Sequence, residues 1–123
     1  MPLAVFITHL ILTLGFDIYG NFSRFDILMH FIGGLSIGYS YILFYKFLQQ
    51  ENIIISKDLI LNIFFIISIV ALTAVLWEMA EFVSDYFYHT RVQVSLDDTM
   101  LDMFLGILGG SLVSFLFKFI KVK

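Results

Sequence analysis

Two segments of this sequence repeat one order of residue types at helical spacing: a serine, an acid, an acid or a histidine, and two glycines. The first copy comprises Ser23, Asp26, His30, Gly34 and Gly38, and the second comprises Ser95, Asp98, Asp102, Gly106 and Gly110. Because residues four apart share a helix face, each copy predicts a stripe with carboxylate or imidazole groups at one end and glycines at the other. Such groups bind metal ions and carry protons.

A third segment divides its small and acidic residues in the same way. Ala71 and Ala74 are followed by Glu78, Glu81 and Asp85 at steps of three and four residues, which is one face of a helix. We therefore expect three helices to bring their acidic ends together. The predicted metal site or polar network consists of Asp26, His30, Glu78, Glu81, Asp98 and Asp102.

Several carboxylates that lie together cannot all stay ionised without compensation. The sequence leaves three compensations open: a bound divalent cation, protonation within a polar network, and ion pairs with Arg24 or Arg91. Carboxylates with an imidazole suit Mn, Fe or Zn, whereas an all-oxygen site suits Mg. Arg91 could instead bind an anionic ligand. Asp26 and Asp98 also have a simpler interpretation, because acids in a first turn stabilise a helix start.

The glycines of the two repeated segments predict close helix packing. Gly34 and Gly38 form one G-x-x-x-G motif, and Gly106 and Gly110 form another. In a bilayer such motifs let two helix backbones approach each other. We expect these four glycines to close the bundle and so to press the acidic ends together.

Composition indicates whether these helices lie in water or in a membrane. The chain has 123 residues, of which 60% are hydrophobic and 14% charged, and its mean hydropathy is +0.97. Average globular domains have roughly 45–50% apolar and 25% charged residues, so the chain belongs to the membrane class. A net charge of −3 without a dense basic run argues against a nucleic-acid partner, and the absence of cysteine excludes disulfides.

Four apolar runs predict an all-α membrane protein with four transmembrane helices in a compact bundle. The runs are Met1–Phe16, Ile27–Tyr45, Leu59–Trp77 and Met103–Phe117, and a span needs about 20 residues. We expect helices over residues 2–19, 25–48, 58–84 and 97–119, within a single transmembrane domain of residues 1–123.

Basic residues predict the orientation of this bundle. Cytoplasmic segments are enriched in lysine and arginine, and an N-in/C-in arrangement gives the cytoplasmic side five basic residues against two. The five are Lys46, Lys57, Lys118, Lys121 and Lys123, and the two are Arg24 and Arg91. The acidic ends of the helices would then lie in the outer leaflet.

The segments "FDILMHFIGG", "LWEMAEF" and "TRVQVSLDDTMLDMFLGILGGSL" resemble the motif blocks of the VanZ-like superfamily of small membrane proteins. Typical members have lysine, glutamine and asparagine where this chain has Ile27, Glu81 and Asp102, and the acidic versions look closest to the YjdF-type branch. The resemblance implies a four-helix core in the plasma (inner) membrane of a bacterial-type cell, with a role at the cell envelope.

Three classes of function remain open from the sequence. A metal-dependent enzyme could act on a lipid-linked substrate, because a bound metal can activate water. A proton- or cation-coupled transporter could use the intramembrane acids, although four short helices would need a homo-oligomer to enclose a pore. A non-catalytic protein could bind a lipid or a partner. Each of these classes places the chain in the lipid bilayer.

Overall fold

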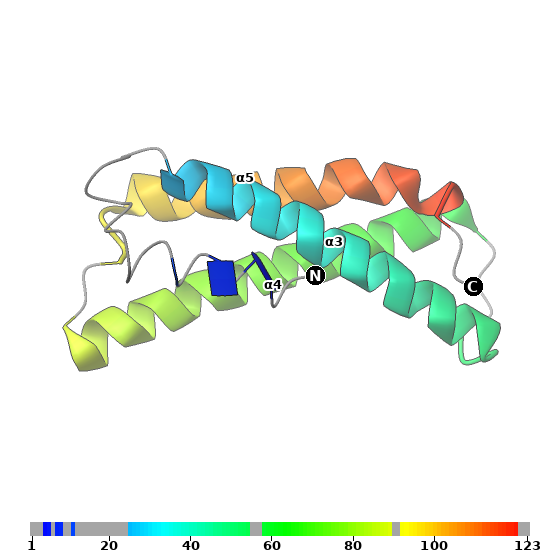
Figure 1. Ribbon diagram of the computed structural model, residues 1–123, viewed down its shortest axis with the longest axis horizontal. Coiled ribbons are helices and arrows are strands. Elements are labelled where there is room, and N and C mark those ends of the chain that lie inside the picture. The colour runs from blue at the N-terminus through cyan, green and yellow to red at the C-terminus, as the bar shows by residue number, and fades with distance from the viewer. Residues whose placement is uncertain are drawn as a thin grey trace.

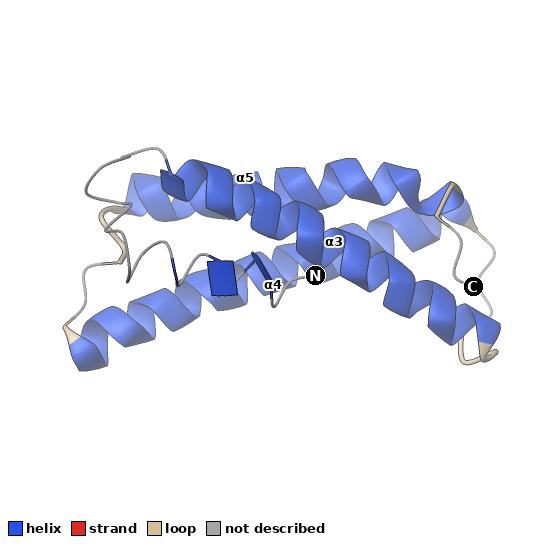
Figure 2. Cartoon of the chain, viewed as in Figure 1, coloured by secondary structure: helices blue, strands red, loops and turns tan. Residues whose placement is uncertain are grey.

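The computed structural model describes residues 4, 5, 7, 8, 11, 25–54, 58–89 and 92–120. Three long helices make up most of this part of the chain: α3 spans Phe25–Gln50, α4 spans Leu59–Tyr88 and α5 spans Leu96–Ser114 (Figure 1). A short 3-10 helix, η1, continues α5 over Phe115–Lys118. All regular structure in the described ranges is helical (Figure 2).

The prediction of four membrane-spanning helices is wrong. In the described part of the chain, three helices are long and apolar enough to cross a bilayer: Phe25–Gln50, Leu59–Tyr88 and Leu96–Lys118. The fourth was expected over residues 2–19, where the apolar run Met1–Phe16 has 16 residues against the about 20 that a span needs. The run Met103–Phe117 is also short, but its helix continues on both sides to give the 23 residues of Leu96–Lys118. Most of that range lies outside the described residues.

The predicted N-in/C-in arrangement is also wrong, because it requires an even number of membrane crossings and the described residues contain three candidate spans. Three crossings put Phe25 and Lys118 on opposite sides of a membrane. The start of α3, the end of α4 and the start of α5 all lie at the left of Figure 1. We call this the acidic end of the molecule, and we call the other the far end.

Side chains fix the helix boundaries near both ends. Asp58 caps α4, since its Oδ1 accepts a hydrogen bond of 2.9 Å from the Leu61 N–H. The helix stops at His89, which has a left-handed backbone with φ of 55°, a usual way to end a helix. Ser95 caps α5 by accepting a 3.2 Å bond from the Asp98 N–H. Asp98 thus lies in the first turn of α5.

Glycines bring α3 and α5 into backbone contact. A Cβ on Gly34 would overlap the backbone oxygen of Gly106, and a Cβ on Gly38 would lie 3.0 Å from the Gly110 Cα. Close approach at glycine is the usual basis of tight membrane helix pairs. Gly109, which lies outside the G-x-x-x-G motifs, also packs on the α3 backbone, at Phe31.

The apolar core lies toward the far end. It consists of Ile42, Tyr45, Ile66, Val70 and Phe117, and the Tyr45 hydroxyl donates a buried 2.8 Å hydrogen bond to Asn62 Oδ1.

The outside of the helices is covered with large apolar side chains. Phe64 is 68% exposed, Phe82 61% and Phe104 59%. An apolar surface of this extent would cause aggregation in water, whereas in a bilayer it contacts lipid chains. The prediction of a multi-pass membrane protein is therefore supported by the fold.

Candidate metal centre

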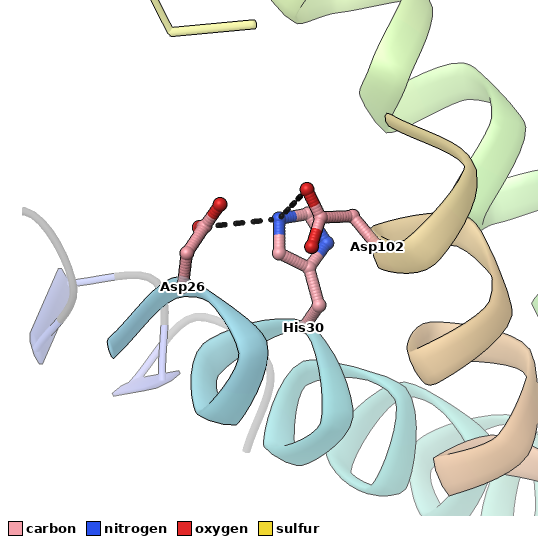
Figure 3. Close-up of side chains that lie close together, drawn as sticks. All are labelled: Asp26, His30 and Asp102. Carbon is pink, nitrogen blue, oxygen red and sulfur yellow. Dashed lines mark ion pairs between the residues drawn. The ribbon is translucent and has the colours of Figure 1, made fainter. Parts of the chain in front are cut away.

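His30 is the point at which the three helices meet at the acidic end. Its Nε2 lies 3.4 Å from Asp26 Oδ1, one turn earlier on α3, and 3.8 Å from Asp102 Oδ2 on α5 (Figure 3). Its Nδ1 lies 3.8 Å from Glu78 Oε1 on α4. The imidazole therefore has carboxylates on both sides, and these come from three helices.

Two of these carboxylates are buried without full hydrogen bonding. Glu78 is 5% exposed and Asp102 is 3% exposed. Glu78 Oε1 and Asp102 Oδ1 have no hydrogen-bond partner, although a buried polar oxygen normally has one. A buried carboxylate that lacks donors is costly unless a cation or a proton compensates it.

The cluster contains two overlapping sets of potential metal ligands. One set is Asp26, His30 and Asp102, and the other is His30, Glu78 and Glu81; within each set the ligand atoms all lie within 4.8 Å of one another. We call these five residues the carboxylate–histidine cluster. Glu81 Oε1 also accepts a 2.7 Å hydrogen bond from the Trp77 indole N–H.

The separations between His30 and its carboxylates are compatible with ligands of a shared metal ion. Distances of 3.4 and 3.8 Å from His30 to its carboxylates exceed the usual hydrogen-bond length of about 2.7–3.2 Å. Two ligands at about 2.0–2.2 Å from one ion can lie up to about 4.4 Å apart. One imidazole with carboxylates is a donor set for Mn, Fe or Zn.

The remaining predicted residues lie elsewhere. Asp98 belongs to neither ligand set among the described residues, and its N–H takes part in the helix cap. Arg91, the predicted anion-binding or pairing residue, lies outside the described residues. Gly34, Gly38, Gly106 and Gly110 lie in the helix contacts given above.

Gln93, which no sequence pattern indicated, positions Glu78. The Gln93 side-chain amide donates to the Glu78 backbone oxygen at 2.9 Å and to Glu78 Oε2 at 3.2 Å. Both carboxylate oxygens of Asp85 in turn accept backbone N–H groups of the loop, from Val92 at 2.9 Å and from Gln93 at 3.0 Å. The isolated glutamine of the stretch "RVQVS" is the signal that could have indicated this role.

A cavity of about 560 Å³ begins beside the cluster and runs along the helices toward the far end. His30 and Trp77 line it at the acidic end, and Tyr41 and Thr73 line it deeper. Its walls are mainly apolar residues and glycines of α3 and α4, including Gly33 and Ala74, together with Gly106 of α5 and Val5 near the N-terminus. His30 therefore borders both the cluster and the cavity.

One family model matches nearly the whole chain. It is described as "Predicted membrane protein (DUF2238)" and matches residues 2–123. No curated protein and no solved structure matches the chain. The family description agrees with the three helices that are apolar and long enough to cross a bilayer.

Proposed function

The chain belongs to this family of predicted membrane proteins, and from that premise we propose that it binds a divalent cation at the carboxylate–histidine cluster. The ion would be Mn, Zn, Fe or Mg, with His30 and carboxylates of the three helices as ligands. Acidic residues inside membrane helices usually mark such functional sites.

The observation that carries this proposal is a pair of buried carboxylate oxygens without a hydrogen-bond partner; Ser36 Oγ, the third such oxygen in the described residues, is a hydroxyl outside the cluster. Glu78 Oε1 and Asp102 Oδ1 belong to different helices and different ligand sets, and each lacks a hydrogen-bond donor. His30 lies between these carboxylates and offers one nitrogen to each. If one nitrogen binds the ion, the N–H of the other can donate to a carboxylate, as is usual for metal-bound histidine.

The far end argues against a path for ions through these three helices. It holds the apolar core, and its one buried polar side-chain pair, Tyr45 and Asn62, is satisfied by a mutual hydrogen bond within the described residues. We therefore favour binding over transport.

The resemblance to VanZ-like and YjdF-type proteins favours a place in the bacterial-type inner membrane and a role at the cell envelope. The positive-inside rule favours the acidic end as the outward one. A cation site there would meet lipid head groups and envelope intermediates rather than cytoplasmic solutes.

Elemental mass spectrometry of the detergent-purified protein tests cation binding directly. We expect near-stoichiometric metal in the wild type and its loss in both His30→Ala and Asp102→Ala. Asp97→Ala is the matched control, because Asp97 is an exposed acid of the first turn of α5 outside both ligand sets. A wild type that stays metal-free after incubation with Mn, Zn and Mg would contradict the proposal.

A further inference from the structure

We propose that the cavity binds one acyl chain of a membrane phospholipid, whose phosphate is a ligand of the cation at the carboxylate–histidine cluster. This inference rests on the proposed cation site and names the class of molecule that the site would take. The cavity has a volume of about 560 Å³, within the range of about 300–1,000 Å³ that is usual for small-molecule sites.

The shape of the cavity fits an extended chain. Its lining residues on α3 run from Met29 to Tyr41, which is about 18 Å along a helix at 1.5 Å per residue. Gly33, Gly34 and Gly106 contribute no side chain to it, which leaves room along the α3 wall. It lies between helices that span the membrane, where the surrounding molecules are lipid chains.

The deep end of the cavity is lined by polar groups that already have partners. The Tyr41 and Thr73 hydroxyls lie 3.1 Å apart in a hydrogen bond between α3 and α4. Thr73 Oγ1 also donates to the Ile69 oxygen at 2.9 Å, and Ser40 donates to the Ser36 oxygen at 2.9 Å. These groups offer little to a polar ligand, so the deep end favours an apolar tail.

The acidic end of the cavity favours a polar ligand rather than an apolar one. His30 and Trp77 form its wall there, and the Trp77 indole is tied to Glu81 by a hydrogen bond. A free anion would be repelled by the surrounding carboxylates. An ion with three protein ligands keeps coordination positions open, and phosphate oxygens are ligands that Mg and Mn prefer. A phosphate head group with an apolar tail therefore matches both ends.

Gly33 provides a means to fill the cavity without disturbing the helix contacts. A Cβ on Gly33 would meet no atom within 4 Å, in contrast to Gly34. Gly33→Phe would place its ring in the space that the chain would occupy. Ile32→Phe is the control, because Ile32 is adjacent on α3, is 36% exposed and does not line the cavity.

Photo-crosslinking in nanodiscs tests the proposal. The probes are a phosphatidic acid and a diacylglycerol that carry the same diazirine acyl chain, used with Mn²⁺ present. We expect phosphatidic acid to label cavity residues such as Thr73 and Ala74 severalfold more than diacylglycerol does. Gly33→Phe should lower this labelling severalfold and Ile32→Phe should not. Asp102→Asn should abolish the preference for phosphatidic acid over diacylglycerol, as expected when metal binding is weakened.

Each outcome separates the two proposals when metal content is measured on the same samples. Stoichiometric metal with equal labelling by both probes would overturn the phospholipid inference and leave the cation site in place. Stronger labelling by phosphatidic acid in a protein found to contain no metal would overturn both the cation site and its role in lipid binding. A change from dimer to monomer in Gly33→Phe, seen by native mass spectrometry, would assign the cavity to a second copy and overturn the lipid. If Gly33→Phe fails to fold, the comparison of the two probes on the wild type still tests whether the cavity binds a phospholipid.

Discussion

His30 connects the three helices through its two nitrogens, and Trp77 lies next to the same cluster. Nε2 faces Asp26 and Asp102, and Nδ1 faces Glu78. Which nitrogen binds the ion determines which carboxylates are direct ligands and which accept the remaining N–H. The sole tryptophan of the chain, Trp77, is hydrogen-bonded to Glu81, so its fluorescence reports on this cluster alone.

Titration with Co²⁺ should quench the fluorescence of Trp77, because a paramagnetic ion held by Glu81 or its neighbours would lie close to the indole. Asp102→Asn should raise the Co²⁺ concentration needed for half-maximal quenching by more than about tenfold. Asp97→Asn, an exposed acid on the same helix, should titrate like the wild type. Quenching that is identical in both variants would place the bound ion outside the cluster.

Gln93→Leu should weaken cation binding by about 10–100-fold, because residues that orient a metal ligand have effects of this size. The substitution removes both hydrogen bonds to Glu78 and frees its carboxylate to rotate away from His30. Isothermal titration with Mn²⁺ measures the affinity. Gln50→Leu makes the same change at the exposed end of α3 and should leave the affinity unchanged. A loss of thermal stability without a loss of affinity would give Gln93 a purely structural role.

At the scale of the helices, contact between α3 and α5 depends on particular glycines. Gly34→Ala should lower the free energy of unfolding by about 1–3 kcal/mol, as overpacking of a tight contact does, because its methyl group would overlap the Gly106 backbone. Gly33→Ala should instead be neutral or stabilising by up to about 1 kcal/mol, since alanine favours helix and its methyl group meets open space. Thermal unfolding in detergent micelles compares the two variants. Equal effects would show that α3 and α5 do not pack through Gly34.

Local spacing predicted more of these helices than it predicted of the site. The i, i+4 stripes indicated three apolar helices and placed Asp26 on the same face of α3 as His30, because helical spacing determines which residues share a face. Local spacing could not indicate Gln93, because its contact with Glu78 depends on how the loop between α4 and α5 folds back. Counting apolar runs also gave one span more than the described residues show, because run length alone does not separate Met1–Phe16 from Met103–Phe117, with 16 and 15 residues. The second run is extended by polar-flanked helix turns to the 23 residues of Leu96–Lys118.

At the scale of the whole molecule, three crossings and the charge distribution together predict which side each loop faces. Glu51 follows α3 at the far end, and His89 follows α4 at the acidic end; both are exposed. Lys46 and Lys118 also lie toward the far end, which the positive-inside rule assigns to the cytoplasm. The acidic end would then face outward, where phospholipid head groups and envelope components are accessible to the cluster.

Because the chain has no cysteine, single-cysteine variants test this orientation without background. In intact cells, a membrane-impermeant maleimide should label His89→Cys at once and should label Glu51→Cys only after permeabilisation. The reverse pattern would keep the three crossings but turn the cluster toward the cytoplasm, so that any phospholipid bound there would come from the inner leaflet. Labelling of both positions from one side would show that α4 does not cross the bilayer. The carboxylates of α4 could then not meet His30 at the membrane surface in the arrangement on which the cation site depends.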